Sequence, residues 1–334
     1  MKFILQYPQA NGLEKDMLDC GDVAEIAAAA EAAGFDGFSL TEHPIPGANW
    51  LAQGGHQSLD PFVALAFAAA RTKRLRLLTY LAVVPYRNPF LLAKASATLD
   101  RLSGGRFTLG VGSGYHKTEF FALGVDFEER NALFDEALEV LPLAWSGEPF
   151  SYKGRHFEAR NVIQRPLPTQ QPIPIWIGGN SKLARRRAAR VQGWMPMGGT
   201  AELAQTTRTA HIGSLDVLAD MIAEVKEMAG ARAGDLDFVG QYPDPGLSAD
   251  PTRDVERHRE VFARQERVGI TCTVVTPPLR ARSNARSCGS RLSSTRTSGV
   301  TSAPCSLKSF WFDEPRNDAS IRPGVMVRPV ASTT

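Results

Sequence analysis

The chain alternates short apolar runs with helix-start signals, and this alternation limits its fold more than any other feature of the sequence. Most of the runs are continuously apolar, which is typical of parallel strands covered by helices. The eight candidate strands are KFILQY (residues 2–7), FDGFSLTEH (35–43), RLRLLTYLAVV (74–84), RFTLGVG (106–112), IPIWIGG (173–179), GWMPMGG (193–199), LDFVGQ (236–241) and GITCTVVT (269–276). Eight βα repeats predict a closed TIM (β/α)8 barrel, whose chemistry lies on the loops after the strand C-termini.

Four helix starts are marked by capping residues. Asp22, with Glu25 three residues later, forms a capping box before an alanine-rich segment that Gly34 closes. The other three starts place a capping side chain directly before a proline, whose missing N–H has no helical partner at that position. These starts are Asp60-Pro61, Asn88-Pro89 and Asp250-Pro251.

Two segments break the rhythm of the barrel, which we expect to span residues 1–276. Residues 147–172 (GEPFSYKGRHFEARNVIQRPLPTQQP) predict an inserted hairpin and a proline-rich excursion beside the barrel mouth. Residues 277–334 form an irregular basic tail with no legible helix where a barrel would place its last one. We weigh two interpretations of this tail: a disordered segment, or out-of-frame translation of a gene whose true C-terminus encoded that helix.

Composition excludes several classes of protein. From Leu279 onward the chain holds nine of its 38 basic and three of its 35 acidic residues, so 29 basic and 32 acidic residues precede it and nucleic-acid binding by the body is disfavoured. No apolar run reaches the roughly 18 residues of a membrane helix, and the start MKFILQYPQ lacks a secretion signal, so we expect a cytoplasmic protein. We predict neither a disulfide framework nor a metal site, because Cys20, Cys272, Cys288 and Cys305 are not paired at ligand spacing.

The stretch GGRFTLGVGSGYHKTEF (residues 104–120) resembles a dinucleotide-binding loop only superficially. Gly110, Gly112 and Gly114 give the spacing G-x-G-x-G, which fails the G-x-G-x-x-G fingerprint by one residue. The residues from Tyr115 to Glu119 are polar, whereas a nucleotide-binding helix opens with small apolar residues. We therefore interpret the stretch as a strand end that delivers side chains into a site.

Two further strand ends carry candidate functional groups. His43 ends the second strand, where an imidazole can exchange a proton with a substrate, although it could equally bond only to the loop of Pro44 and Pro46. Gly178 to Ser181 (GGNS) follow a strand and open a helix. This turn is either an ordinary connection or a phosphate site that uses free backbone N–H groups.

Two long stretches carry a family resemblance. Residues 83–145 (VVPYRNPFLLAKASATLDRLSGGRFTLGVGSGYHKTEFFALGVDFEERNALFDEALEVLPLAW) and 172–199 (PIPIWIGGNSKLARRRAARVQGWMPMGG) closely resemble the luciferase-like monooxygenase family. Within it, the resemblance is nearer to the oxidoreductases that use the deazaflavin coenzyme F-420. The match covers roughly Met1 to Thr276.

The resemblance implies a flavin ring at the barrel mouth and a phosphate arm over the later loops. Glu42 and His43 are then the ring contact and the proton-transfer group. A cis peptide between Tyr80 and Leu81 is expected against the ring. The other cofactor-binding residues that the resemblance implies are Ala82, Gly112, Tyr115, Thr118, Gly178, Gly179, Asn180, Gly198 and Gly199, with His116 and Thr200 beside them.

The sequence also departs from its deazaflavin relatives. Some of them place a catalytic glutamate where Tyr115 stands and a tryptophan where Gly47 stands, which puts the sugar-phosphate dehydrogenase reaction in doubt. AQGGHQ resembles their mobile loop and keeps His56, although a lone histidine in a loop is more often solvated. The arginines of KLARRRAAR (Arg185, Arg186, Arg187 and Arg190) predict a solvated helix face with about one inward side chain.

We therefore expect an oxidoreductase that binds F-420 non-covalently and transfers hydride to or from a small organic substrate. The first alternative is an FMN-dependent monooxygenase supplied by a separate flavin reductase. The second is a non-enzymatic, defective barrel that lacks its last helix. A homodimer is a further partnership to test, and the substrate and the direction of hydride transfer stay open.

Overall fold

The barrel strands form one closed ring of parallel neighbours. In this computed structural model, which describes residues 1–242 and 254–276, the ring runs β1, β2, β3, β5, β8, β9, β10 and β11 and returns to β1. The strands are β1 (Lys2–Gln6), β2 (Gly37–Leu40), β3 (Arg76–Thr79), β5 (Phe107–Gly112), β8 (Ile175–Gly178), β9 (Gly193–Met195), β10 (Asp237–Tyr242) and β11 (Cys272–Val275). The predicted TIM barrel is confirmed.

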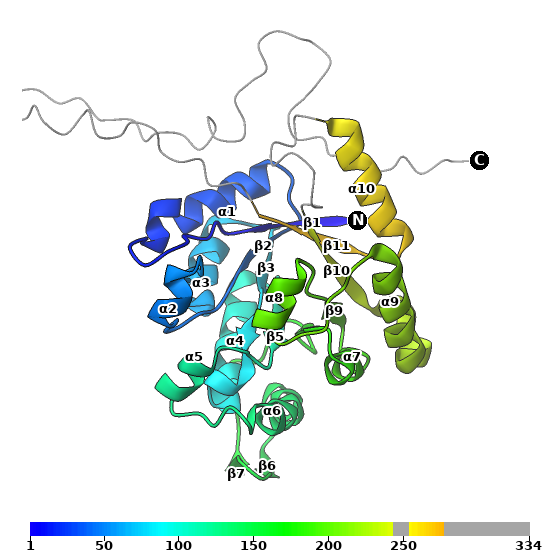
Figure 1. Cartoon of the computed structure of the whole chain (residues 1–334). Coiled ribbons are helices and arrows are strands. Elements are labelled where there is room, and N and C mark those ends of the chain that lie inside the picture. Colours follow the sequence, from blue (N-terminus) through cyan, green and yellow to red (C-terminus); the bar gives the residue numbers. More distant parts are fainter. Residues whose placement is uncertain (243–253, 277–334) are drawn as a thin grey trace, which may run out of the picture. The chain divides into compact units, whose positions relative to one another are not determined.

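Helices cover the outside of this ring, as Figure 1 shows. The covering helices are α1 (Val23–Ala32), α3 (Pro61–Arg71), α4 (Pro89–Ser103), α6 (Arg130–Trp145), α7 (Lys182–Ala188), α9 (Leu215–Ala229) and α10 (Val255–Arg267). Shorter helical segments lie in the loops: η1 (Met17–Cys20), α2 (Ala48–Ala52), η2 (Val84–Tyr86), α5 (Lys117–Ala122), α8 (Ala201–Thr206) and η3 (Gly230–Asp235). Seven of the eight expected βα units are thus complete within the described residues.

The helix starts follow the predicted caps. Asp60 accepts hydrogen bonds from the backbone N–H groups of Phe62 and Val63, both at 2.9 Å, and Asn88 accepts one from Phe90 at 2.9 Å. Each bond satisfies a donor that has no partner within its own helix.

Only one side of the capping box at α1 forms. Asp22 accepts bonds from Ala24 and Glu25 at 2.8 and 3.0 Å. The Glu25 carboxylate instead pairs with Arg71 of α3 at 2.9 Å. It therefore links two outer helices and does not accept the reciprocal bond from the backbone N–H of Asp22.

The barrel interior is filled by apolar side chains from almost every strand. Its central cluster is Ile4, Leu78, Trp176, Met195, Val239, Cys272 and Val274, with Tyr80 and Leu81 packed against it. Burying side chains of this size contributes about 1.5 to 3 kcal/mol each. The interior is consequently a packed core, and room for a ligand exists only at its ends.

The third barrel strand is interrupted near the mouth. β3 ends at Thr79, the Tyr80–Leu81 peptide is cis, and the chain resumes as β4 (Ala82–Val83). Both parts pair with β5. The implied position of the cis peptide is confirmed.

The predicted insertion is a hairpin of two antiparallel strands, β6 (Phe150–Lys153) and β7 (Glu158–Val162). Figure 1 shows it projecting beyond α6. The Glu136 carboxylate of α6 accepts bonds from the N–H groups of Arg155, His156 and Phe157 at 3.0 to 3.2 Å. These bonds anchor the hairpin turn to the barrel.

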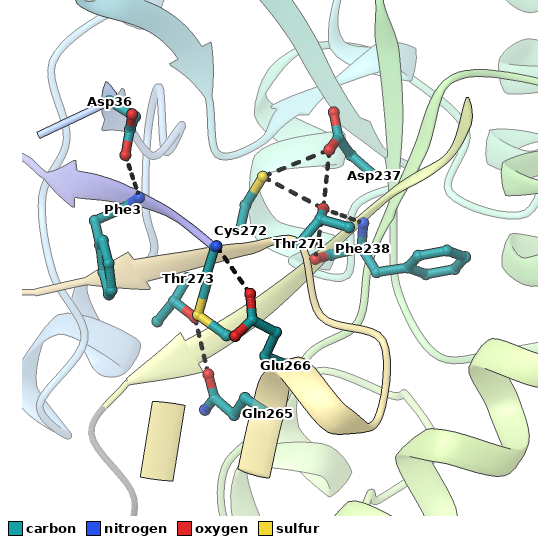
Figure 2. A network of polar contacts seen from close by, with 10 residues as sticks. Phe3, Asp36, Asp237, Phe238, Gln265, Glu266, Thr271, Cys272 and Thr273 are labelled. Carbon is teal, nitrogen blue, oxygen red and sulfur yellow. Dashed lines mark hydrogen bonds and ion pairs between the residues drawn. The ribbon is translucent and has the colours of Figure 1, made fainter. Parts of the chain in front are cut away.

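Polar contacts link the strands at the end of the barrel opposite the mouth, as Figure 2 shows. Asp237 at the start of β10 accepts a bond from Thr271 at 2.9 Å and lies 3.8 Å from the sulfur of Cys272. Thr273 of β11 donates to Gln265 of α10 at 2.8 Å. Burial, aided by the charge of Asp237, raises the pKa of Cys272 to about 12. This sulfur is therefore a neutral thiol that belongs to the strand network.

Some sequence predictions lie outside the described residues. They are the helix start at Asp250-Pro251, the tail 277–334, and Cys288 and Cys305 within that tail. Among the described residues, no helix combines the length and the apolar character that a membrane crossing requires.

Candidate active site

A cleft of about 1480 Å³ opens at the C-terminal ends of the barrel strands. It is lined by the loops that follow β2, β5, β8 and β9, the positions at which TIM barrels carry their chemistry. Its wall includes Glu42, His43, Tyr80, Leu81, Gly112, Tyr115, Gly178, Gly179, Asn180, Gly198 and Gly199. Eleven of the thirteen predicted site residues are thus brought together; Ala82 and Thr118 do not line the cleft.

His43 is held by a buried carboxylate that the sequence did not single out. Nδ1 of His43 lies 3.2 Å from Oε2 of Glu119 on α5, and the Tyr86 hydroxyl donates to the same oxygen at 2.8 Å. Glu119 is fully buried, and His43 is 8% exposed. Nε2 of His43 has no hydrogen-bond partner among the residues that the structure describes, so it is the ring nitrogen available to a ligand.

Four aromatic rings surround His43, and we call them with His43 the aromatic cluster. The ring centroids of Trp50 and His56 lie 4.7 and 4.9 Å from that of His43, and those of Tyr115 and His116 lie 6.0 and 6.2 Å away. Gly47 stands where some deazaflavin relatives place a tryptophan. Here Trp50 of α2 places an indole next to His43 instead. The glycine at position 55 makes this possible, because a Cβ there would lie 2.4 Å from the Trp50 ring.

The ionisable rings around His43 in the aromatic cluster are uncharged at neutral pH. Burial, aided by the nearby His43, lowers the pKa of His56 to about 4. Burial also lowers the pKa of His116 and raises the pKa of Tyr115 to about 12. His56 and His116 are therefore neutral imidazoles and Tyr115 is a neutral phenol.

Glu42 has both carboxylate oxygens engaged within the protein. Oε2 accepts the N–H of Val83 at 2.6 Å, and Oε1 pairs with Arg87, which also lies 3.6 Å from Asp60. Burial raises the pKa of Glu42, and the Arg87 guanidinium and the Val83 N–H oppose this rise. Glu42 thus ties the end of β2 to β4.

The glycines around β5 make room for protein atoms. A Cβ on Gly112 or Gly178 would lie 2.5 or 2.1 Å from a methyl group of Leu81, and one on Gly110 would lie 2.0 Å from the Thr79 carbonyl oxygen. These three glycines therefore accommodate the interrupted strand and the Leu81 side chain.

Asn180 braces the loops at the other end of the cleft. Its Nδ2 donates to the carbonyls of Met197 and Ala210 at 2.7 and 2.6 Å, and its Oδ1 accepts the Met197 N–H at 2.7 Å. Its backbone N–H donates to Thr209 at 2.9 Å. Contacts within the protein therefore occupy the side chain that we expected at the phosphate.

Two guanidinium groups lie over one phenyl ring at this end. Arg130 and Arg208 lie 3.8 and 5.2 Å from the ring centre of Phe127, and all three residues line the cleft. The nearest carboxylate to Arg130 is that of the exposed Glu128, 3.8 Å away. This end of the cleft is consequently suited to an anionic group.

The arginines of α7 differ from the expected solvated face. Arg187 is 5% exposed and pairs with Asp135 through two bonds of 2.7 and 3.0 Å. Arg185 pairs with Glu224 of α9 at 2.8 Å. Two inward arginines therefore hold α7 against its neighbours, and only Arg186 and Arg190 are exposed.

The sequence missed Glu119, Tyr86 and Trp50. Glu119 lies four residues after Tyr115 in the polar stretch at the end of β5, which was the available signal. Tyr86 and Trp50 lie in loops without a motif.

The sequence is similar to those of known proteins. Residues 1–243 match the family model described as luciferase-like monooxygenase. The chain belongs to this family. The F420-dependent glucose-6-phosphate dehydrogenase of Gordonia bronchialis is 30% identical over 259 residues, covering 71% of this chain and 70% of the relative.

Solved structures of an F420-dependent reductase and of an FMN-bound monooxygenase component share the fold. The coenzyme F420-dependent tetrahydromethanopterin reductase from Methanopyrus kandleri has a TM-score of 0.59 at 17% identity, covering 83% of this chain and 93% of its own. The oxygenating constituent of 3,6-diketocamphane monooxygenase from Pseudomonas putida, in complex with FMN, has a TM-score of 0.56 at 17% identity, covering 80% and 77%. The family is enzymatic, so the interpretation as a non-enzymatic barrel is not retained.

Proposed function

We propose that the cleft binds a flavin-type cofactor, F-420 in preference to FMN, and that the enzyme transfers hydride to or from a small organic substrate. The observation that carries this proposal is the Glu119-bound His43 at one end of a long cleft in a luciferase-like barrel. When bound, such a cofactor supplies or accepts the hydride at its ring.

The cleft fits an elongated anionic cofactor together with a substrate. Its volume of about 1480 Å³ exceeds the roughly 300 to 1,000 Å³ of common ligand sites. Neutral aromatic groups lie at the His43 end, and Arg130 and Arg208 lie at the other. A planar ring near Tyr80, Leu81 and Tyr115 and a phosphate near Gly198 and Gly199 would match this division.

Each protein group has a role in this proposal. His43 holds or accepts a proton at Nε2, the nitrogen that no described residue bonds. The aromatic cluster excludes water from that atom, which strengthens polar interactions there. Glu42 positions the end of β4 through Val83. Asn180 keeps the loops of Met197 and Ala210 in place around the cofactor arm.

F-420 is preferred because the relative at 30% identity uses it, whereas the FMN-bound structure supports only the fold. An FMN-dependent monooxygenase would need reduced flavin from a reductase partner. A substrate other than a sugar phosphate is favoured because Tyr115 and Gly47 replace two residues of the deazaflavin sugar-phosphate dehydrogenases that the sequence resembles. We further place the enzyme in the cytoplasm and leave a homodimer to be tested by light scattering.

Paired titrations test the cofactor. The full chain is titrated with F-420 and with FMN, and binding is followed by fluorescence. We expect micromolar binding of F-420, and micromolar FMN binding without F-420 binding would reject the first choice. The matched variant His43→Asn should keep cofactor affinity within a few fold and lose turnover by about 10²- to 10⁴-fold once a substrate is found.

A further inference from the structure

The ring contacts of the aromatic cluster do not determine which nitrogen of His43 carries the proton. An imidazole presents a lone pair only at the nitrogen that is not protonated, and the tautomer is set by the bond that the other nitrogen makes. The groups that could set it are those packed around the ring: Glu119, Tyr86, Tyr115, His56 and His116.

We propose that Glu119 is a positioning residue that fixes His43 in the Nδ1–H tautomer and thereby directs a lone pair from Nε2 into the cleft. Oε2 of Glu119 accepts the Tyr86 hydroxyl at 2.8 Å and faces Nδ1 of His43 at 3.2 Å. A carboxylate only accepts hydrogen bonds, so Nδ1 must be the donor to Glu119.

The surrounding groups fix which atoms donate and which accept in these hydrogen bonds. Burial and the charge of Glu119 raise the pKa of Tyr86 above its ordinary value, so the phenol stays a donor. The other faces of the His43 ring meet Trp50, His56, Tyr115 and His116 through ring contacts. None of these four residues hydrogen-bonds the imidazole, so Glu119 is the only described side chain that sets the tautomer.

A second consequence concerns the charged ring. When Nε2 takes a proton, the imidazolium lies beside the buried carboxylate of Glu119. The imidazolium and the carboxylate then form an ion pair through the contact between Nδ1 and Oε2. Glu119 therefore both aims the base and stabilises it after proton uptake. This inference rests on the proposed function for its purpose, but its test needs neither cofactor nor substrate.

The test is the ¹⁵N spectrum of the full chain labelled at histidine, recorded as a function of pH. His43 is assigned by the signal lost in His43→Asn. In the unsubstituted protein we expect a protonated Nδ1 and an unprotonated Nε2 wherever the His43 ring is neutral. Finding the proton on Nε2 there would overturn the proposal without any variant of Glu119.

Variants give the second arm. Glu119→Gln should mix the two tautomers, because an amide can either accept from or donate to Nδ1. Glu128→Gln is the matched control and should keep the tautomer, because the Glu128 side chain is 74% exposed. Tyr86→Phe should also keep the tautomer. An unchanged tautomer in a folded Glu119→Gln protein would refute the inference as well.

The outcomes separate this inference from the proposed function. If neither cofactor binds while His43 shows the expected tautomer, the proposed function fails and the positioning role stands. If F-420 binds at micromolar concentration while the proton lies on Nε2, only the positioning role fails.

Discussion

The contact between Leu81 and two glycines gives a prediction with a worked magnitude. In Gly178→Ala the new methyl group would lie 2.1 Å from Cδ2 of Leu81, whereas carbon atoms pack at about 3.5 to 4.0 Å. Leu81 cannot turn toward β5, because a methyl group of its side chain already occupies the space where Gly112 lacks a Cβ. The side chain or the strand must therefore move by more than about 1 Å.

Overpacking of this kind destabilises by about 1 to 3 kcal/mol. For a domain of this size each kcal/mol lowers Tm by about 2 to 4 °C, so we expect a decrease of roughly 2 to 12 °C in a thermal melt followed by circular dichroism. The matched control is Gly234→Ala, since Gly234 has no positive φ and no atom within 4 Å of the added carbon. Its Tm should stay within about 1 °C or rise slightly.

A double variant tests the mechanism itself. Leu81→Ala removes the atoms with which the new methyl group collides, so Gly178→Ala should destabilise much less in that background. We expect a coupling of about 1 to 3 kcal/mol between the two changes. Additive losses, or a Gly178→Ala protein as stable as the Gly234→Ala control, would show that Leu81 does not explain the glycine.

Three further predictions concern other parts of the site. Folding lowers the pKa of His56 from 6.5 to about 4, so the unfolded chain binds a proton first as the pH drops. The free energy of unfolding should therefore fall by up to about 3 kcal/mol between about pH 6.5 and 4. Urea melts of His56→Gln should show a smaller decrease over this range. Arg208→Gln should weaken F-420 binding by about 10- to 100-fold in fluorescence titrations, while the exposed Arg186→Gln variant should bind F-420 as the unsubstituted protein does. Asn180→Ala removes three partly buried bonds to the backbone of Met197 and Ala210, so it should destabilise by about 1 to 3 kcal/mol and increase hydrogen exchange at Met197.

The fold could be predicted because its signals are local. Continuous apolar runs reported strands covered on both faces, and Asp60 and Asn88 marked helix starts through bonds to residues two and three positions away. The fate of Glu25 could not be predicted, because its partner Arg71 lies on another helix and the capping motif contains no information about that neighbour.

The sequence indicated candidate site residues only where they directly follow a strand. His43 and Tyr115 follow strands directly, so the barrel geometry places them at the mouth. The bond from His43 to Glu119 joins residues 76 positions apart, and no short motif encodes such a contact. The glycines show a related limit: a sequence reveals that a Cβ is missing, whereas the atom that fills the space, here Leu81, appears only in three dimensions.

The two ends of the cleft come largely from different halves of the chain. His43, Tyr86 and Glu119 lie before the hairpin insertion, while Asn180, Gly198 and Arg208 lie after it. Each half contains four consecutive strands of the ring, and a hybrid made by joining at the hairpin would keep every bond to His43. Such chimeras with related barrels would exchange the loops of Asn180, Gly198 and Arg208 while retaining Arg130 and the bonds to His43, and so separate the contributions of the two halves to ligand binding.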